Sequence, residues 1–308
     1  MHQASLARRY RSASALWLGI LSLVLLLCFP EVIADGVREG MSLAYRSVIP
    51  AVFPSMILSE ALLHADLTLL DRTLGRALST LFGVSEIGAR AVLLGLLSGF
   101  PIGAKVTAEL YREARISKEE AERLLLLSSS PSPGFLVGAI GSEMLGSRSL
   151  GIRLCLIHLA SLATVGCLLR GRRHKHERSP LSPLPSVSFG FSFSRSVEGA
   201  ALGCIRVTAC VSFFSMVSAL VRNAVSNLIL TSFFSAVLEL GSGAHAAVSA
   251  GGGLSPLFLG FSVGFSGLSV YLQSRSYGCE AGLSMRAYIV GKIFVGILCG
   301  VLCLLFLS

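Results

Sequence analysis

The chain has 308 residues, of which 53% are hydrophobic and only 14% are charged, and its mean hydropathy is +0.74. Soluble domains carry about 25% charged residues, so this composition excludes an ordinary soluble domain and predicts an all-α protein that crosses a membrane several times. The net charge of +9 is gathered in two basic clusters, residues 8–11 and 170–178. That uneven distribution argues against nucleic acid as a partner, and the positive-inside rule places both clusters in the cytoplasm.

The cysteines and histidines show no spacing typical of a metal site. Eight cysteines lie mostly inside apolar runs, without a Cys-x-x-Cys pair. Because metal centres and disulfide frameworks need closer clustering, we expect no metal and no cofactor, and we interpret the thiols as small core side chains. The three histidines inside or beside apolar runs are each expected to make ordinary hydrogen bonds: His64, His158 and His245.

The N-terminal part, residues 1–35, joins a short basic tail to an uncharged, leucine-rich stretch from Ser12 to Pro30 that is long enough to span a bilayer. A cleaved secretory signal is the alternative; the many later apolar segments favour a retained first transmembrane helix. The next apolar run, residues 47–59, contains Pro50 and Pro54, which predict a kink or a break.

Further along the first half, Ser117 is followed three residues later by Glu120, a capping-box pattern that predicts the start of a new helix. The sequence SSSPSPG at residues 128–134 then interrupts an apolar run. Residues 135–146 and 152–169 are expected to be membrane segments, the second of which ends at the central basic cluster.

The most informative segment reads GFPIGAK, residues 99–105, inside the apolar run that begins at Ala91. It contains Gly99, Pro101 and Gly103, followed at once by Lys105. Glycine and proline leave backbone groups that lipid cannot satisfy, so this backbone must lie against protein or a water-lined cavity. The chain therefore has a broken membrane helix here.

Residues 260–270, GFSVGFSGLSV, repeat the glycine pattern of this segment in the second half. At an offset of 159 residues, Val48 matches Val207 and Val52 matches Val211. The matches predict a duplicated unit, with one repeat at 36–170 and another at 197–308. A basic, Pro/Ser-rich linker at 171–196 separates them and is expected to be cytoplasmic. We expect inverted repeats, although the flanking charges do not fix the orientation.

Many carriers hold substrate between broken helices at corresponding positions of two repeats, which makes the residues at and near the breaks candidates for binding a solute. The candidates are Gly99, Pro101, Gly103, Lys105, Ser129, Ser130, Gly264, Ser266, Gly267, Ser269 and Gln273. Ionisable side chains in apolar surroundings are also candidates, here Glu60 and Glu239 for a cation or a proton. The alternatives are close helix packing for the glycines, a snorkelling Lys105, loop roles for the serines, and helix capping or pairing with arginine for the glutamates.

The sequence resembles the sporulation integral membrane protein YlbJ family, within the wider set of proteins that carry a nucleoside-recognition or Gate domain. The resemblance rests on three blocks that cover residues 52–63, 99–141 and 264–273. It implies a multi-pass protein of the bacterial cell membrane with a role in sporulation, and Gate-like repeats that suggest movement of a small solute. The chain departs from the family pattern at three places. The family tends to have a tyrosine where Phe100 stands, asparagines near the position of Ser129–Ser130, and a histidine where Tyr271 stands.

Three functions follow as hypotheses. The first is a transporter or channel-like protein for a small polar solute, nucleoside-like or ionic, embedded in the lipid bilayer, with no enzymatic activity and able to form a homo-oligomer. The second is a non-transporting scaffold in spore-envelope assembly. The third and most remote is an intramembrane serine protease using Ser266; its counterpart in the first half is Pro101.

Overall fold

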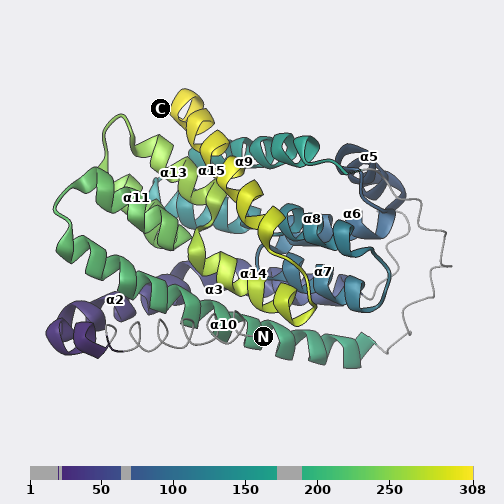
Figure 1. Cartoon of the computed structure of the whole chain (residues 1–308), viewed down its shortest axis with the longest axis horizontal. Helices are drawn as coiled ribbons and strands as arrows, with labels where there is room; N and C mark the ends of the chain where they lie inside the picture. The colour runs from purple at the N-terminus through teal and green to yellow at the C-terminus, as the bar shows by residue number, and fades with distance from the viewer. Residues whose placement is uncertain (1–19, 21–22, 64–70, 172–188, 308) are drawn as a thin grey trace, which may run out of the picture.

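The computed structural model describes residues 20, 23–63, 71–171 and 189–307, and every element in these ranges is helical (Figure 1). Within them, five helices are long and apolar enough to cross a membrane: Pro30–Ser59, Arg148–Leu168, Ser196–Ala224, Ser255–Glu280 and Arg286–Phe306. A sixth candidate is bent by 101°, between Thr73–Phe82 and Glu86–Ser98. The prediction of an all-α polytopic membrane protein is confirmed. The greater part of the expected first helix, Ser12–Pro30, lies outside the described residues.

Large apolar side chains lie on the outside of these helices. Leu168, Ile205 and Leu305 are each more than half exposed. In water such surfaces would be unfavourable, whereas lipid acyl chains solvate them. The outer surface therefore contacts the bilayer.

Two long helices form one side of the molecule. The first consists of α2 (Pro30–Leu43), the π-helical turn η1 (Ala44–Val48) and α3 (Ile49–Leu63); the second is α10 (Phe189–Ala224). A Cβ atom at Gly36 would lie 2.7 Å from Met216 Cα, and one at Gly203 would lie 2.8 Å from Met56 Cε. The early part of one helix thus packs on the late part of the other, so they run antiparallel. The Arg222 guanidinium donates to the Glu39 carboxylate across this contact.

The prolines do not break the first of these helices. α3 continues through Pro54, and α2 to α3 counts as one candidate span. The π-helical turn η1 ends two residues before Pro50, which has no N–H to give to the carbonyl of Arg46 in that turn. The π-helical turn therefore accommodates Pro50, which cannot donate a backbone hydrogen bond, without ending the helix.

The rest of the first half is built from short helices. After η2 (Asp71–Gly75) and α5 (Arg76–Phe82), α6 (Glu86–Ser98) and α7 (Ile102–Arg112) pack on each other as a hairpin. α8 (Lys118–Ser128) and η3 (Phe135–Met144) follow, separated by the SSSPSPG interruption, and α9 (Arg148–Leu168) packs back on η3. Ser117 Oγ accepts a hydrogen bond from Glu120 N at 3.2 Å, which confirms the predicted helix start.

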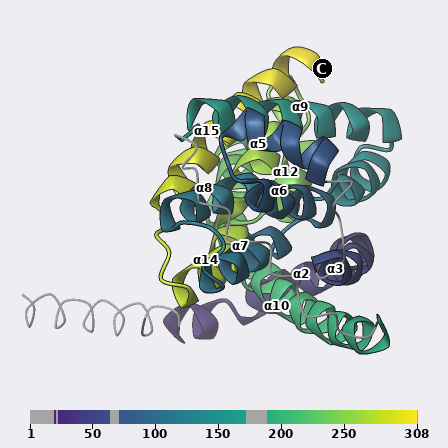
Figure 2. The same ribbon diagram turned by 90° about the vertical axis from the view of Figure 1, so that its right-hand side faces the viewer.

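The second half contains another hairpin and another interrupted helix. α11 (Leu228–Leu238) and α12 (Leu240–Ala250) pack on each other and meet at Glu239. α13 (Ser255–Phe265) and α14 (Gly267–Glu280) form one candidate span with a discontinuity at Ser266. α12, which is labelled in Figure 2, also packs back on α13, so the glycine-rich stretch after Leu240 contains a hairpin as well as the discontinuity at Ser266.

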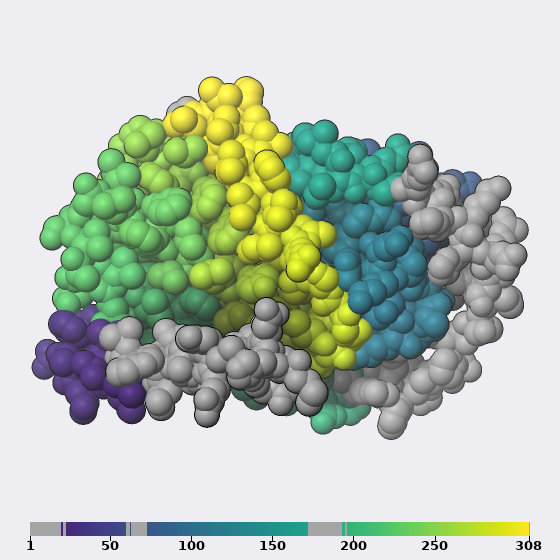
Figure 3. Space-filling view, in the orientation of Figure 1, coloured from purple at the N-terminus to yellow at the C-terminus, as the bar shows by residue number. Residues whose placement is uncertain are grey.

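The last helix, α15 (Arg286–Phe306), lies along α13. A Cβ at Gly296 would lie 2.9 Å from Phe265 Cβ, and one at Gly300 would lie 2.8 Å from the Leu257 carbonyl. Gly296 and Gly300, four residues apart, therefore let α15 pack closely on α13. On the face shown in Figure 3, the C-terminal segment, drawn yellow, runs between the surfaces of the two halves.

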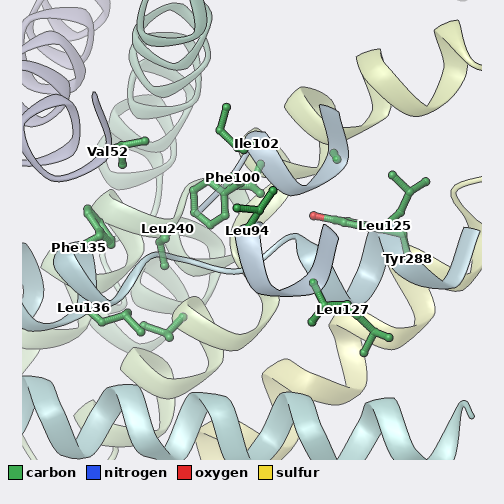
Figure 4. Packing of buried hydrophobic residues seen from close by; sticks show 14 of the residues in the cluster. Val52, Leu94, Phe100, Ile102, Leu125, Leu127, Phe135, Leu136, Leu240 and Tyr288 are labelled. Atoms are coloured by element: carbon green, nitrogen blue, oxygen red, sulfur yellow. The ribbon is translucent and has the colours of Figure 1, made fainter. Parts of the chain in front are cut away.

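The buried core is shared by the two halves. Its apolar side chains include Val52, Phe100, Phe135 and Leu240, which lie around one region in Figure 4. Phe100 and Phe135 belong to the broken elements of the first half, and Leu240 begins α12 of the second. The broken segments of both halves therefore pack into one interior.

Candidate functional site

The tip of the α6–α7 hairpin lies on the interruption between α8 and η3. The Ser128 carbonyl fills the space where a Cβ would stand at Gly95 and also at Gly103. At the tip itself, a Cβ at Gly99 would lie 2.9 Å from Ser132 N, and Gly99 has a φ of +81° that L side chains rarely adopt. The glycines of GFPIGAK thus let a hairpin close over the end of a neighbouring helix.

The second half repeats this arrangement with different residues. The tip of the α11–α12 hairpin is Glu239, and a Cβ at Gly267 would lie 3.0 Å from Glu239 Cα. Gly267 directly follows the discontinuity at Ser266, and both have positive φ angles, +78° and +70°. In each half, therefore, the tip of a helical hairpin packs on the break of the interrupted helix that follows it.

The two segments paired by sequence do not have the same shape. Residues 99–101 form the tip of a packed hairpin, whereas Ser266 interrupts a helix that continues in one candidate span, Ser255–Glu280. By shape, the α6–α7 tip corresponds to the α11–α12 tip. The Ser129–Ser132 interruption corresponds to Ser266.

One cavity lies between the two tips and the long antiparallel helices. It encloses about 370 Å³ of empty space, part of it open to the surroundings. Its lining is mostly apolar and comes from both halves: Val48, Val52, Gly99, Phe100, Pro131, Ser132, Phe135, Val207, Val211, Glu239, Leu240, Val270 and Gln273. The two valine pairs matched at the 159-residue offset all belong to this lining.

A few polar groups face this apolar cavity. Glu239, only 3% exposed, caps α12 by accepting a hydrogen bond from Ser242 N at 2.5 Å. Gln273 Nε2 lies 3.3 Å from Ser269 Oγ, while Gln273 Oε1 is buried and has no hydrogen-bond partner among the described residues. An apolar wall with a few fixed polar groups is typical of a small-molecule site. The free amide oxygen offers an acceptor to a ligand that has an N–H or O–H.

Two basic side chains lie behind the breaks, one for each half. His158 of α9 is buried, and its Nε2 lies 2.7 Å from Ser130 Oγ. Lys292 of α15 is buried, and its Nζ donates to Ser266 Oγ at 3.3 Å. The hydrogen bond expected of His158 is confirmed. Lys292 was not among the predicted site residues, although a lysine between the apolar residues Tyr288 and Val295 was a visible signal.

The predicted site residues fall into those that line the cavity and those that do not. Gly99, Gln273 and Glu239 line it. Seven others lie buried in the tips, in the breaks or in the adjoining first turn of α14: Pro101, Gly103, Ser129, Ser130, Ser266, Gly267 and Ser269.

Three predicted residues fall elsewhere. Gly264 packs against α15, where a Cβ would lie 2.8 Å from Gly296 Cα, so it serves helix packing. Lys105 is half-buried on α7. The side chain of Glu60 lies outside the described part of the structure, as does all of His64.

Comparison with known proteins supports the resemblance expected from the sequence. The chain is 25% identical over 317 aligned positions to the sporulation integral membrane protein YlbJ of Bacillus subtilis, and the match covers 90% of this chain and 78% of that protein. The predicted YlbJ resemblance is confirmed. No protein-family model matches the chain, and no solved structure matches it.

The positions expected from the resemblance to depart from the family pattern occupy different places around the site. Phe100 lines the cavity. Ser129 and Ser130 lie behind it in the first break, where Ser274 Oγ is 3.5 Å from Ser129 Oγ. Tyr271 stacks obliquely on Tyr288 at 5.9 Å between ring centroids. Of these positions, Phe100 is the one that a ligand in the cavity would meet directly.

Proposed function

We propose that this protein is a carrier for a small polar solute, built from two inverted repeats at 36–170 and 197–308. The observation that carries the proposal is the convergence of two hairpin tips and two broken helices on one cavity. Broken helices are unfavourable in lipid unless their free backbone groups line a cavity or meet protein. Carriers use such paired breaks to bind a solute between their repeats.

The antiparallel packing of the two long helices supports the inverted arrangement. The 159-residue offset matches α2–α3 to α10 in sequence, and these helices run in opposite directions in space. Equivalent helices of inverted repeats have that relation. The valines matched at this offset line the cavity from two neighbouring helices.

We also propose the membrane in which this carrier resides, its orientation there and the class of its solute. The basic N-terminal tail and the linker at 171–196 face the cytoplasm by the positive-inside rule, and the protein resides in the bacterial cell membrane. The name of the Bacillus subtilis relative supports a part in sporulation. A nucleoside is one candidate solute, because its ribose hydroxyls can donate to Gln273 Oε1, which has no partner among the described residues; the cavity would have to widen to admit it.

Uptake into proteoliposomes tests the carrier proposal. Full-length protein is reconstituted and supplied with labelled uridine, adenosine and inosine, and with divalent cations as a second panel. We expect uptake of at least one solute above that of protein-free vesicles, and a loss of about 10-fold in Gln273→Leu, which removes the cavity's amide. Folded wild-type protein that moves none of them would favour the scaffold function, in which Gln273→Leu and Lys105→Met are both tolerated.

A hydrolase is a second candidate, because the structure places Lys292 Nζ 3.3 Å from Ser266 Oγ. Serine with a lysine base is a known catalytic pair. It ranks second because Ser266 is fully buried, does not line the cavity, and has its hydroxyl 3.1 Å from the Val263 carbonyl. Labelling by a fluorophosphonate probe in the wild type and not in Ser266→Ala would establish this activity; an unlabelled wild type would dismiss it.

A further inference from the structure

Lys292 has no carboxylate partner among the described residues, although its side chain is fully buried in a candidate membrane span. A charged amine at such a position is costly unless polar groups compensate it. The compensation must come from what lies around its Nζ atom.

The register of α15 on α13 places Lys292 at one particular point. A Cβ at Gly260 would lie 2.8 Å from Cys303 Cβ, and one at Gly264 would lie 2.8 Å from Gly296 Cα. The two helices are therefore antiparallel, and Lys292, one turn before Gly296, lies past the carboxyl end of α13. The carboxyl end of α13 carries partial negative charge that favours a cation, whereas the amino end of α14, which begins at Gly267, carries partial positive charge.

The contacts of the amine agree with this placement. Lys292 Nζ donates to Ser266 Oγ at 3.3 Å, and Ser266 Oγ lies 3.1 Å from the Val263 carbonyl in the last turn of α13. The Tyr288 ring lies 5.9 Å from Nζ and adds a cation–π contact. A hydroxyl, a helix end and an aromatic face thus surround the ammonium group.

The titratable neighbours of Lys292 supply no fixed negative charge. α9 brings His158, and α15 itself brings Tyr288 and Cys299, while α13 has no titratable side chain. Glu122 of α8 accepts instead from Ser284 N, before α15 begins.

The first half has the same arrangement with a side chain that can be neutral. Ser130, at the α8–η3 break, is hydrogen-bonded to His158, which lies 28 residues further along the chain; Ser266 is hydrogen-bonded to Lys292, 26 residues further. Each break is thus held by a basic side chain of the next helix. The second break is held by the intrinsically more basic group, a primary amine in place of an imidazole.

We propose that the α13–α14 break is a cation site whose occupant is the chain's own Lys292 ammonium. In secondary carriers, the carboxyl ends of half-helices and unwound carbonyls bind a coupling Na⁺ or proton; here the tethered amine takes that place, so the site binds no Na⁺. The assignment of Lys292 to the place of a coupling ion rests on the proposed carrier function, whereas the cation site itself does not. The experiment below measures no transport, so failure of the cation site can be distinguished from failure of the carrier function.

The experiment restores a cation to a site from which the tethered one has been removed. Full-length Lys292→Ala, in lipid nanodiscs, lacks the three carbons and the ammonium group beyond Cβ. Propylammonium matches these missing atoms in size and charge. Propylammonium chloride at about ten times its Kd is expected to raise its Tm by about 2 °C. The wild type and Lys292→Met, whose side chain fills the same space without charge, should show no such rise. Uncharged 1-propanol should not replace propylammonium.

Three results would overturn the proposal. Equal stabilisation of Lys292→Ala by propylammonium and 1-propanol would mean that only a void is filled. Absence of any specific gain in Lys292→Ala would mean that no cation site exists. The third result decides the matter if Lys292→Ala does not fold. A higher Tm in Na⁺ or Li⁺ than in K⁺ or choline at equal ionic strength, present in the wild type and lost in Ser266→Ala, would show that the break is open to external ions. The proposal predicts no salt dependence that is lost in Ser266→Ala.

Discussion

Gly103→Ala tests the contact between the first hairpin tip and the first break. The added Cβ would lie 2.8 Å from Ser128 Cβ and closer still to the Ser128 carbonyl oxygen. The same carbonyl also lies against Gly95 of α6, so a shift of Ser128 to make room would disturb both contacts of the hairpin. Overpacking of this kind costs about 1–3 kcal/mol, or a loss of about 2–5 °C in Tm for a chain of this size.

Gly138→Ala is the matched control, because a Cβ there meets nothing within 4 Å. Alanine is favoured over glycine in a helix by about 0.5–1 kcal/mol, so this variant should be as stable as the wild type or more so. The assay is thermal unfolding of the full-length protein. A fluorescent maleimide monitors it by reacting with the buried thiols of Cys299 and Cys303 as they become exposed. If the two variants had equal Tm values, the tip would not be clamped on Ser128 as described.

Two further pairs of variants probe the second tip and the basic side chains behind the breaks. Gly267→Ala and Gly282→Ala both place alanine at a positive φ, but only Gly267 faces Glu239, so Gly267→Ala should lose about 1–2 kcal/mol more in unfolding free energy; equal losses would contradict the second tip contact. His158→Ala leaves a buried void and removes the hydrogen bond to Ser130, and should cost about 2–4 kcal/mol, whereas His245→Ala, exposed on α12, should change stability by less than about 0.5 kcal/mol. Denaturant or thermal unfolding measures both pairs, and a mild effect of His158→Ala would show that the break does not depend on it.

The sequence revealed those features that follow from composition and local backbone chemistry. Low charge predicted a membrane bundle, and Gly99 with Pro101 predicted a broken helix, because lipid does not solvate free backbone groups. The Ser117–Glu120 capping box predicted the start of α8, because its hydrogen bond depends only on neighbouring residues.

The contacts between distant segments could not be predicted in the same way. Glu239 forms a hairpin tip without any glycine or proline beside it; it caps α12 with its own carboxylate, a signal that also fits an ordinary helix start. The glycine pattern led to a pairing of residues 99–105 with 260–270, but glycine at four-residue spacing marks close packing in a hairpin and in a straight helix alike. Gly264 is the clearest case, since it contacts α15 and not the cavity.

The valines of the long helices carried a better signal than the glycines. Val48, Val52, Val207 and Val211 matched at a constant offset, and all four line the cavity. Their apolar character gave no hint of a binding site, because valine is also an ordinary core residue. The role of such residues follows only from the cavity that they surround.

The most direct test of the cavity as the solute site is uptake by two variants of α10. Val207→Phe places a larger ring inside the cavity, whereas Ile205→Phe, two residues away, changes a side chain that is 66% exposed toward lipid. In proteoliposomes with equal amounts of monodisperse protein, the account predicts that Val207→Phe abolishes uptake of the transported solute and Ile205→Phe leaves it unchanged. Unchanged uptake in Val207→Phe would contradict the account.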